Sequence, residues 1–415
     1  MKGITVTNAA EEPIVTLDIS DPIFLADRFR TYREIQASNP VARTLVNDQS
    51  SWLLTRYRDV ERILKDPMCV VEPVPGQIPA HVGDGPAAQF YRLSLPNMDP
   101  PQHTRLRRLA GPAFAPRAIA SMRGWVEEII SAGIDRLAEF DSEVDFVSEF
   151  ATRVPAQIAC RLLHAPAEDA ATVLQRMPAL NAVLSQSEIT SQQLAEADEV
   201  AQFYFDYIGG IVDGNRGRLS ADDPVGALLA AEEAGDKLSR EELVVTLVGF
   251  FVASYHTTMV AMTNTVAALL ANRDQYVALQ KDPSLAGNAW EESLRYDAPV
   301  HFIWRYAPPG LEIAGKQIDA GSHLLLGLAA ANRDPEKFDN PDSFDLTRAR
   351  IRHLAFTAGG HFCLGAPLSR IEGEILLRLL PEKLPNIELR EKNPPRIPDL
   401  TFPAVTQLRV SPHGR

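Results

Sequence analysis

The sequence predicts a mainly α-helical protein with small β-sheets, built as one domain. Apolar residues recur at helical spacing through the first three quarters of the chain, whereas alternating segments are short and few. No internal repeat or low-complexity linker divides the 415 residues, so one interlocked domain is favoured, although this length also permits two. With 45% hydrophobic and 23% charged residues, the chain can bury a large core.

The predicted elements follow one another along the chain. Helices are expected at Asp21 to Gln36, Tyr57 to Lys65, Pro101 to Ala113, Arg117 to Leu137, Ser148 to Leu163, Leu194 to Ile211, Arg240 to Ala271 and Ala366 to Leu380. Strands are expected at Val41 to Leu45, Ser51 to Leu54, Leu311 to Ile313 and Lys316 to Ile318. Ala314 and Gly315 fit a two-residue hairpin turn between the last two strands.

The segment Val71 to Asp99 is rich in Pro and Gly and is longer than an ordinary connection. Binding residues are often found on such long loops. We interpret this segment as a candidate binding loop, and a plain solvent loop is the alternative.

Charge and cysteine content argue against several classes of protein. A net charge of -13 without a Lys/Arg-rich run disfavours a nucleic-acid partner. Cys69, Cys160 and Cys363 stand far apart, which argues against a disulfide framework or a thiolate zinc site and fits a reducing compartment. The first residues lack the pattern of a signal or transit peptide, so we expect a cytoplasmic protein.

The apolar stretch Leu243 to Ala271 is long enough to cross a membrane. Its polar side chains, which would be costly in lipid, include Ser254, His256, Thr257, Thr258, Thr263 and Asn264. Acidic residues precede the stretch and Arg273 follows it. We therefore expect a long buried helix of a soluble protein with no membrane partner.

The strongest local signal is FTAGGHFCLG, from Phe356 to Gly365, directly before an amphipathic helix. Its glycines allow tight turns and a close approach to a flat ligand. Cys363 would lie just before the helix N-terminus, where the helix dipole and unpaired N–H groups stabilise a thiolate. A small buried thiol would explain the cysteine but not the glycines or Phe356.

The pattern F-x-x-G-x-H-x-C-x-G resembles the haem-binding loop of the cytochrome P450 family, the haem-thiolate monooxygenases. The resemblance runs from about Asp21 to Val410 and implies a triangular single domain, with haem b between a long distal helix and the cysteine loop. It implies residues 1–20 as an N-terminal extension, residues 21–415 as the catalytic domain, and Cys363 as the iron ligand. Further haem-binding residues in the loop are Phe356, Gly359, His361 and Gly365. Thr357 stands where the family normally has glycine, so we expect a local adjustment without loss of haem.

Glu292 and Arg295 are spaced i, i+3 on a predicted helix and by themselves are an ordinary ion pair. Upstream of Cys363 they resemble the family's E-x-x-R motif, whose buried ion pair stabilises the core of the haem loop. Their implied role is structural, and Arg348 is a candidate third member.

Haem propionates need cationic or hydrogen-bonding partners. The resemblance places four of them in three separate segments: His103, Arg107, Arg305 and His353. Each alone could be a surface residue, but together they favour a haem.

The sequence ASYHTT, from Ala253 to Thr258, resembles the family's A-G-x-[D/E]-T-T signature over the distal face of the haem. In the family the threonine organises water near dioxygen, the acid relays protons, and the thiolate pushes electron density. Thr257, Thr258 and His256 are therefore the expected catalytic residues. His256 replaces the usual acid; its unperturbed pKa of about 6.5 would let it relay protons near neutral pH, and a structural histidine is the alternative. Members that lack the acid include enzymes that couple aromatic rings, so coupling and hydroxylation both remain open.

The resemblance also indicates which segments contact the substrate. The expected residues form an amphiphilic, rather aromatic set that suits a medium-sized, partly aromatic molecule: Phe90, Tyr91, Asn181, Tyr255, Val300, His301, Phe302, Trp304 and Phe402.

Electrons must come from another protein, because the sequence has no flavin domain, iron–sulfur cysteine spacing or dinucleotide motif. The resemblance to soluble bacterial members implies ferredoxin and ferredoxin reductase, and we expect a monomer. A basic patch for an acidic ferredoxin could come from Arg105, Arg108, Arg117, Arg352 and Arg370, unless these are scattered surface arginines.

The leading hypothesis is a dioxygen- and ferredoxin-dependent oxidase of specialised metabolism that hydroxylates or couples a small molecule. A peroxide-driven variant is an alternative because the acid is missing, although Thr257 counts against it. A ligand-binding or recruitment module without turnover is the alternative outside the enzymes, and the full set of haem ligands counts against it.

Overall fold

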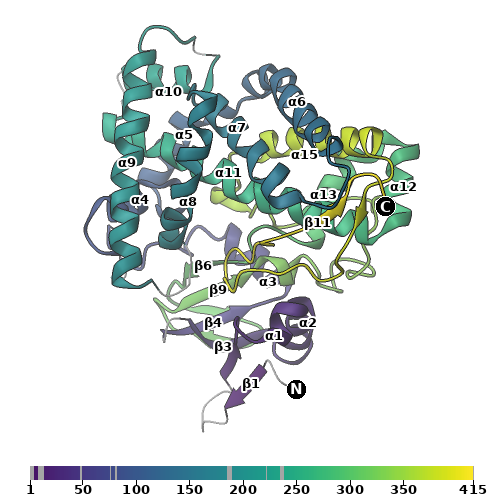
Figure 1. Cartoon of the computed structure of the whole chain (residues 1–415). Coiled ribbons are helices and arrows are strands. Elements are labelled where there is room, and N and C mark those ends of the chain that lie inside the picture. The colour runs from purple at the N-terminus through teal and green to yellow at the C-terminus, as the bar shows by residue number, and fades with distance from the viewer. Residues whose placement is uncertain are drawn as a thin grey trace.

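The computed structural model describes residues 4–7, 14–46, 49–74, 76–79, 82–184, 189–220, 222–233 and 238–414. In Figure 1 a large helical layer lies above a smaller layer that holds the main sheet and the N-terminus. The α-helices of the described residues are α1 Pro22–Ala26, α2 Arg28–Ser38, α3 Tyr57–Lys65, α4 Pro86–Leu93, α5 Gln102–Ala110, α6 Pro116–Ala138, α7 Arg153–Leu162, α8 Ala170–Leu184, α9 Ser191–Asn215, α10 Pro224–Glu233, α11 Arg240–Ala271, α12 Arg273–Lys281, α13 Ala286–Tyr296, α14 Leu328–Ala331 and α15 Ala366–Lys383.

The strands form one large sheet and two small ones. Their bounds are β1 Ile4–Thr7, β2 Ile14–Leu17, β3 Val41–Val46, β4 Gln49–Leu54, β5 Val144–Asp145, β6 Phe302–Tyr306, β7 Leu311–Ile313, β8 Lys316–Ile318, β9 His323–Gly327, β10 Glu388–Leu389 and β11 Arg409–Ser411. The large sheet has the order β1-β2-β3-β4-β9-β6, so the segment predicted as an N-terminal extension contributes two of its strands. The mainly helical fold with small sheets is therefore confirmed.

The hairpin of β7 and β8 has the predicted two-residue turn. Ile313 pairs with Lys316, and the two residues between them have positive φ angles, 54° at Ala314 and 78° at Gly315. Positive φ at both central positions matches the twist of the flanking strands. The predicted strands β3 and β4 are also present and pair antiparallel, with Val41 opposite Leu54.

Helix α11 begins and ends at the predicted residues. Ser239 caps its N-terminus in a capping box with Glu242. By length and composition it is the one helix of the described residues that could cross a membrane, yet 61% of its apolar window is buried inside the protein. Its neighbours include α7, α9 and α13, which makes it the central helix of the core.

Two predicted segments are wrong in detail. The predicted helix Asp21 to Gln36 is broken at Asp27, whose backbone leaves the helical region and whose side chain caps α2 by accepting from the Arg30 N–H. The predicted loop Val71 to Asp99 contains α4, which begins at Pro86. A carboxylate of α9, Asp198, accepts the Ala87 N–H at 2.9 Å, so this helix end is completed by a residue that is distant in sequence.

Other helices were not predicted at all: α8, α10, α12 and α14. Helix α8 contains Pro178 in its interior, a residue that argues against a helix in a sequence read alone. The predicted helix Ser148 to Leu163 starts with a wider π turn over Val147–Ala151 before α7.

Candidate active site

Cys363 lies in a tight loop at the start of α15. Its N–H donates to Phe356 O at 2.9 Å, and the N–H of Phe362 donates to Gly359 O at 3.1 Å, so the loop folds back on itself. The backbone N–H groups of Gly365 and Ala366 hydrogen-bond to the Cys363 side chain. This is the helix-terminus environment that the sequence predicted for a stabilised thiolate.

Opposing effects act on the Cys363 thiol. Burial raises its pKa, whereas the N–H groups of Gly365 and Ala366 and the positive charges of Arg107 and Arg370 oppose that shift. A coordinating metal cation deprotonates a thiol outright. The site therefore provides a thiolate ligand once a cation binds the sulfur.

Contacts within the protein explain the residues at positions 359 and 357 of the cysteine loop. A Cβ on Gly359, where φ is +69°, would lie 2.3 Å from Leu64 O, so this glycine is needed for packing against α3, and its predicted contact with haem stays a prediction. Thr357 has a φ of +60°, a conformation that costs energy for a β-branched residue. Its hydroxyl donates to His361 O at 2.7 Å, which is the local adjustment expected here.

Four basic side chains gather beside the cysteine loop. The rings of His103 and His361 stack with their centroids 4.1 Å apart. Burial, followed by the charges of Arg305, His103 and Arg107, lowers the pKa of His361 to about 3. Neither Arg107 nor Arg305 forms an ion pair with a carboxylate of the described residues, although Arg305 is only 5% exposed.

Asp99 is the acid whose charge acts on Arg305. Its carboxylate oxygens, however, accept the backbone N–H groups of Val71 and Glu72 at 2.9–3.1 Å. The cluster of His103, Arg107, Arg305 and His361 therefore keeps the excess positive charge of its two arginines, which suits a ligand that carries two carboxylates. We call these four residues the cation cluster.

His353 contacts an acid of α13. Its Nε2 lies 3.3 Å from Oε2 of Glu291, and Arg370 binds the same carboxylate at 2.8 Å. The role of His353 as a propionate ligand stays a prediction. The ring that stacks on His103 is that of His361.

Part of helix α11 is accessible to solvent. Ala253 is exposed and Thr257 is half-buried, although most of the helix is buried. The Thr257 hydroxyl donates to Ala253 O at 2.6 Å. An exposed alanine in the middle of a core helix marks space for a ligand against this face.

These features together fit a haem. Cys363 supplies one soft ligand, the cation cluster matches two propionates, and Ala253 leaves room for a flat ring. Among the described residues, no group of three or more His, Cys, Asp or Glu side chains could hold a metal ion directly. A haem would bring its own equatorial nitrogens and need only the sulfur from the chain.

His256 faces away from solvent toward the C-terminal segment. Its ring meets the ring of Phe402 edge to face at a centroid distance of 5.1 Å, and its buried Nδ1 has no partner among the described residues. Burial lowers the pKa of His256 to about 4, and the charge of Asp399 opposes this shift only in part. The side chain is therefore neutral at pH 7, so the predicted basis for a proton relay, an unperturbed pKa, does not hold.

One acid near α11 was missed by sequence reasoning. Glu372 on α15 is 2% exposed, and Thr258 donates to its Oε2 at 3.4 Å. The sequence could have indicated this acid, because it lies on the apolar face of a predicted amphipathic helix, where charged side chains are rare.

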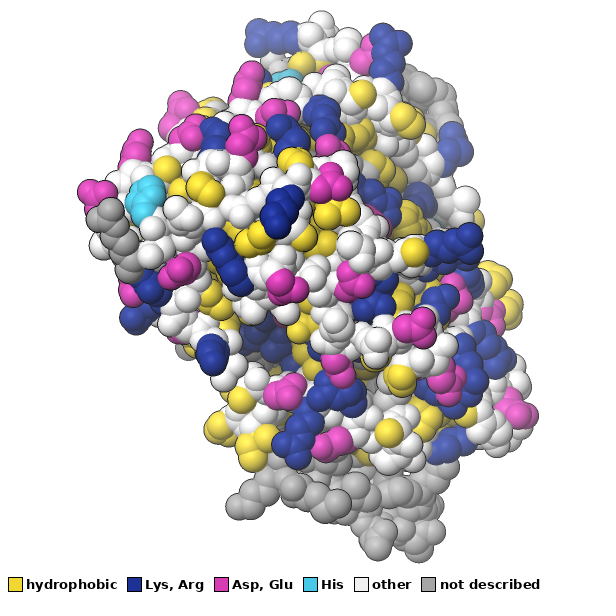
Figure 2. All heavy atoms as spheres, turned by 90° about the vertical axis from the view of Figure 1, so that its right-hand side faces the viewer, with side chains coloured by type: hydrophobic (Ala, Val, Ile, Leu, Met, Phe, Trp, Pro, Cys, Tyr) yellow, Lys and Arg dark blue, Asp and Glu magenta, His cyan; other side chains and the backbone are white. Residues whose placement is uncertain are grey.

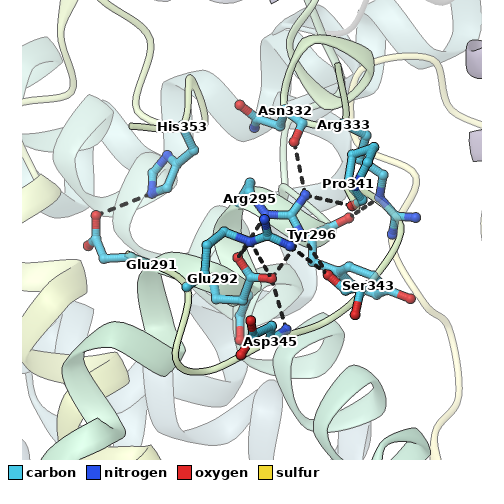
Figure 3. A network of polar contacts seen from close by, with 12 residues as sticks. Glu291, Glu292, Arg295, Tyr296, Asn332, Arg333, Pro341, Ser343, Asp345 and His353 are labelled. Atoms are coloured by element: carbon cyan, nitrogen blue, oxygen red, sulfur yellow. Dashed lines mark hydrogen bonds and ion pairs between the residues drawn. The ribbon is translucent and has the colours of Figure 1, made fainter. Parts of the chain in front are cut away.

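The predicted pair of Glu292 and Arg295 is fully buried. Arg295 Nε and Nη2 donate to the two carboxylate oxygens at 2.7 and 2.8 Å. Arg348, the candidate third member, donates to both oxygens through Nε at 3.2 and 3.1 Å. Figure 3 shows Arg295 also reaching carbonyls of the segment before the cysteine loop, at Asn332, Pro341 and Ser343. The network ties α13 to that segment.

The predicted substrate contacts separate into two groups. Phe90, Tyr91 and Tyr255 lie in the helical core, and Asn181, Val300, Trp304 and Phe402 are partly buried around it. His301 is 0% exposed, and its ring nitrogens contact the hydroxyl of Tyr32 and the carboxylate of Asp297. Phe302 packs against Tyr32 in the core beneath the sheet. We therefore correct the assignment of His301 and Phe302, which are enclosed by protein.

The arginines of the predicted basic patch are largely engaged with acids. Arg105 pairs with Glu242, Arg117 with Asp222, and Arg370 with Glu291. Lys and Arg side chains are interspersed with Asp and Glu on the face seen in Figure 2. That face carries mixed charge.

Comparisons with known proteins agree with this geometry. The family model described as Cytochrome P450 matches residues 28–405. Cytochrome P450 107B1 of Saccharopolyspora erythraea is 35% identical over 380 residues, 89% of this chain and 90% of that protein. Mycinamicin IV hydroxylase/epoxidase of Micromonospora griseorubida is 34% identical over 364 residues, 86% of this chain and 88% of that protein.

Solved structures show the same fold. The bacillaene polyketide synthase cytochrome P450 PksS of Bacillus subtilis has a TM-score of 0.86 and 28% sequence identity. The match covers 96% of this chain and 100% of that one. The chain belongs to the cytochrome P450 family, and it is an oxidoreductase of the monooxygenase type whose family uses a haem-thiolate cofactor.

Proposed function

We propose that the chain is a haem b monooxygenase whose iron is bound by the Cys363 thiolate. Its electrons come from a ferredoxin and a ferredoxin reductase, and its substrate is a medium-sized, partly aromatic molecule of specialised metabolism. The enzyme hydroxylates or oxidatively couples that molecule, and it works as a cytoplasmic monomer.

This proposal rests on the placement of Cys363 at the N-terminus of α15. Beside it lies the cation cluster, whose arginines form no ion pair with a carboxylate in the part of the chain that the structure describes. Two N–H groups support the sulfur. The same helix contacts α11 through Glu372 and Thr258. One helix therefore connects the candidate iron ligand with the residues of the distal side.

The haem would supply activation of dioxygen, and the chain would hold the haem and control protons and water. The cation cluster would bind the propionates, with Arg107 and Arg305 supplying the charges. Thr257 would order water beside dioxygen, because its hydroxyl proton is already given to Ala253 O and its oxygen can accept a hydrogen bond.

The relatives suggest the class of substrate. Their names include a hydroxylase/epoxidase of mycinamicin IV and a hydroxylase of 6-deoxyerythronolide B. The partly buried aromatic side chains of Trp304 and Phe402 suit a ligand with apolar or aromatic surface.

A peroxide-driven reaction is a second candidate, since position 256 lacks an acid. The retained Thr257 counts against it. Greater activity with hydrogen peroxide than with a ferredoxin system would reverse this order.

The test is the absorption spectrum of the dithionite-reduced protein with carbon monoxide, for the wild type and Cys363→Ser. A strongly red-shifted Soret band that is lost in the variant is expected for thiolate-bound haem. Cys160→Ser is the control, because this buried cysteine lies on α7 and is expected to leave the band unchanged. A wild-type spectrum typical of histidine ligation, or no haem at all, would refute the proposal.

A further inference from the structure

One buried carboxylate joins distant parts of the chain. Asp297 follows the last residue of α13, and its side chain is 11% exposed. Nη2 of Arg28, at the start of α2, donates to both of its oxygens at 3.2 Å, and Nη2 of Arg396, in the C-terminal segment, donates to Oδ2 at 2.7 Å. Desolvation of buried charges can outweigh their attraction, so stability alone is a weak reason for this cluster.

Arg396 connects this carboxylate to its own segment. Its Nη1 donates to Pro403 O at 2.9 Å, while its Nη2 is engaged by Asp297. Arg396 also forms an antiparallel bridge with Val405, and we call residues 396–405 the C-terminal hairpin. Because the guanidinium is planar and rigid, its two ends fix this hairpin relative to α13.

The C-terminal hairpin brings Phe402 to the accessible part of α11. The Asp399 carboxylate accepts the Phe402 N–H at 2.7 Å within the turn of the hairpin. The Phe402 ring meets the ring of His256 edge to face, at a centroid distance of 5.1 Å. His256 lies three residues after the exposed Ala253 and one before the half-buried Thr257, so the three share one side of the helix. Phe402 and His256 therefore border the space that the site leaves for a ligand.

Strand β6 is held by the same carboxylate. The His301 N–H donates to Thr401 O of the hairpin at 2.9 Å, and His301 Nε2 lies 3.4 Å from Oδ1 of Asp297. In Figure 1 the C-terminal segment, in yellow, runs beside β6. Val300 and Trp304, close to His301 in sequence, are partly buried. Asp297 therefore links two of the segments that are expected to contact the substrate.

We propose that Arg396 and Asp297 are positioning residues of the substrate pocket. Their ion pair holds Phe402 against His256, and this aromatic pair is a preformed wall that selects ligands with a flat aromatic group. The inference deepens the proposed function and rests on it. Preorganisation matters because each side chain that must be ordered on binding weakens affinity about two- to tenfold. Aromatic rings prefer edge-to-face or offset contacts, and a ring that is already fixed offers such a contact without this cost.

The probes are imidazole and 4-phenylimidazole, which bind haem iron through a ring nitrogen and differ by one phenyl group. Each is titrated into the ferric holoenzyme and followed by the shift of the Soret band. In Arg396→Met the affinity for 4-phenylimidazole should fall about two- to tenfold, whereas the affinity for imidazole should stay that of the wild type. Arg28→Met is the matched control, because it removes the other cation beside Asp297 and leaves the hairpin contact in place. It should lower stability without changing the ratio of the two affinities.

A double-mutant cycle tests whether Arg396 acts through Phe402. Phe402→Ala removes the ring and should weaken 4-phenylimidazole selectively, and adding Arg396→Met to it should cause no further loss. Losses that add would mean that Arg396 acts elsewhere, and the proposal would be wrong. An equal selective loss in Arg28→Met, or unchanged selectivity in Arg396→Met, would overturn it as well.

Arg396→Lys decides the question if Arg396→Met fails to bind haem. Lysine keeps a charge beside Asp297 but lacks the planar fork that reaches both partners, so the selective loss should remain. Wild-type selectivity in this variant would refute the proposal. The carbon monoxide spectrum of each variant separates two kinds of failure. A wild type without the thiolate-haem band contradicts the proposed function, whereas an intact band with unchanged selectivity in the Arg396 variants contradicts only this inference.

Discussion

Replacing Glu292 should destabilise the protein far more than replacing an exposed glutamate. Glu292 accepts hydrogen bonds from Arg295, from Arg348 and from the Asp345 N–H, and its side chain is 0% exposed. Glu292→Gln keeps the volume but removes the charge that balances two arginines. Breaking a buried ion pair by removing one partner costs about 3–5 kcal/mol. That is a large part of the roughly 5–15 kcal/mol that stabilises a typical protein.

The assay is urea unfolding followed by tryptophan fluorescence, together with haem content per polypeptide. Trp290 is buried on the same helix, so its emission reports on this core. Glu34→Ala is the control, because its ion pair with Arg30 has both side chains about half exposed and is worth about 0.3–0.5 kcal/mol. If Glu292→Gln loses less than about 1 kcal/mol, the carboxylate does not balance the arginines and the reasoning fails.

Two further predictions concern the cysteine loop and the cation cluster. Thr357→Gly should remain within about 1 kcal/mol of wild type in the same assay, because relief of a strain of about 1–3 kcal/mol offsets the lost hydrogen bond and the entropy cost of glycine. Thr357→Val keeps the strain and should be less stable; the opposite order would contradict this account. Arg305→Met should stabilise the haem-free protein and weaken haem retention, because this buried guanidinium has no carboxylate ion pair among the described residues. Arg333→Met is the matched control, since that buried arginine pairs with Asp342 and should destabilise the protein without a selective loss of haem.

Local signals in the sequence were sufficient for some elements. The bounds of α11 follow from a capping box at Ser239 and from the apolar run itself, and both are short-range features. The β7–β8 hairpin follows from two residues, Ala314 and Gly315, whose positive φ angles need no distant contact. In both cases the information lies within a few residues of the boundary.

Other elements depend on residues that are distant in sequence. Helix α4 is completed by Asp198 of α9, so its sequence alone reads as a loop. His353 contacts Glu291 of α13, and no local pattern indicates that pairing. His301 is enclosed by Tyr32 and Asp297, which lie on other elements. The resemblance indicated segments of the chain, whereas tertiary contacts decide which of their side chains are enclosed by protein.

The position of Glu372 shows why a motif departure is best interpreted together with helix geometry. The change from acid to histidine at position 256 suggested a relay by His256, yet burial makes that ring neutral at pH 7. An acid on the apolar stripe of α15 would ordinarily be excluded by its desolvation cost. Glu372 is nevertheless buried there in contact with Thr258, on a helix whose Leu376 and Leu380 are fully buried. A helix with so large an apolar face can hold one protonated carboxyl in the core, because burial raises the pKa of Glu372 to about 8.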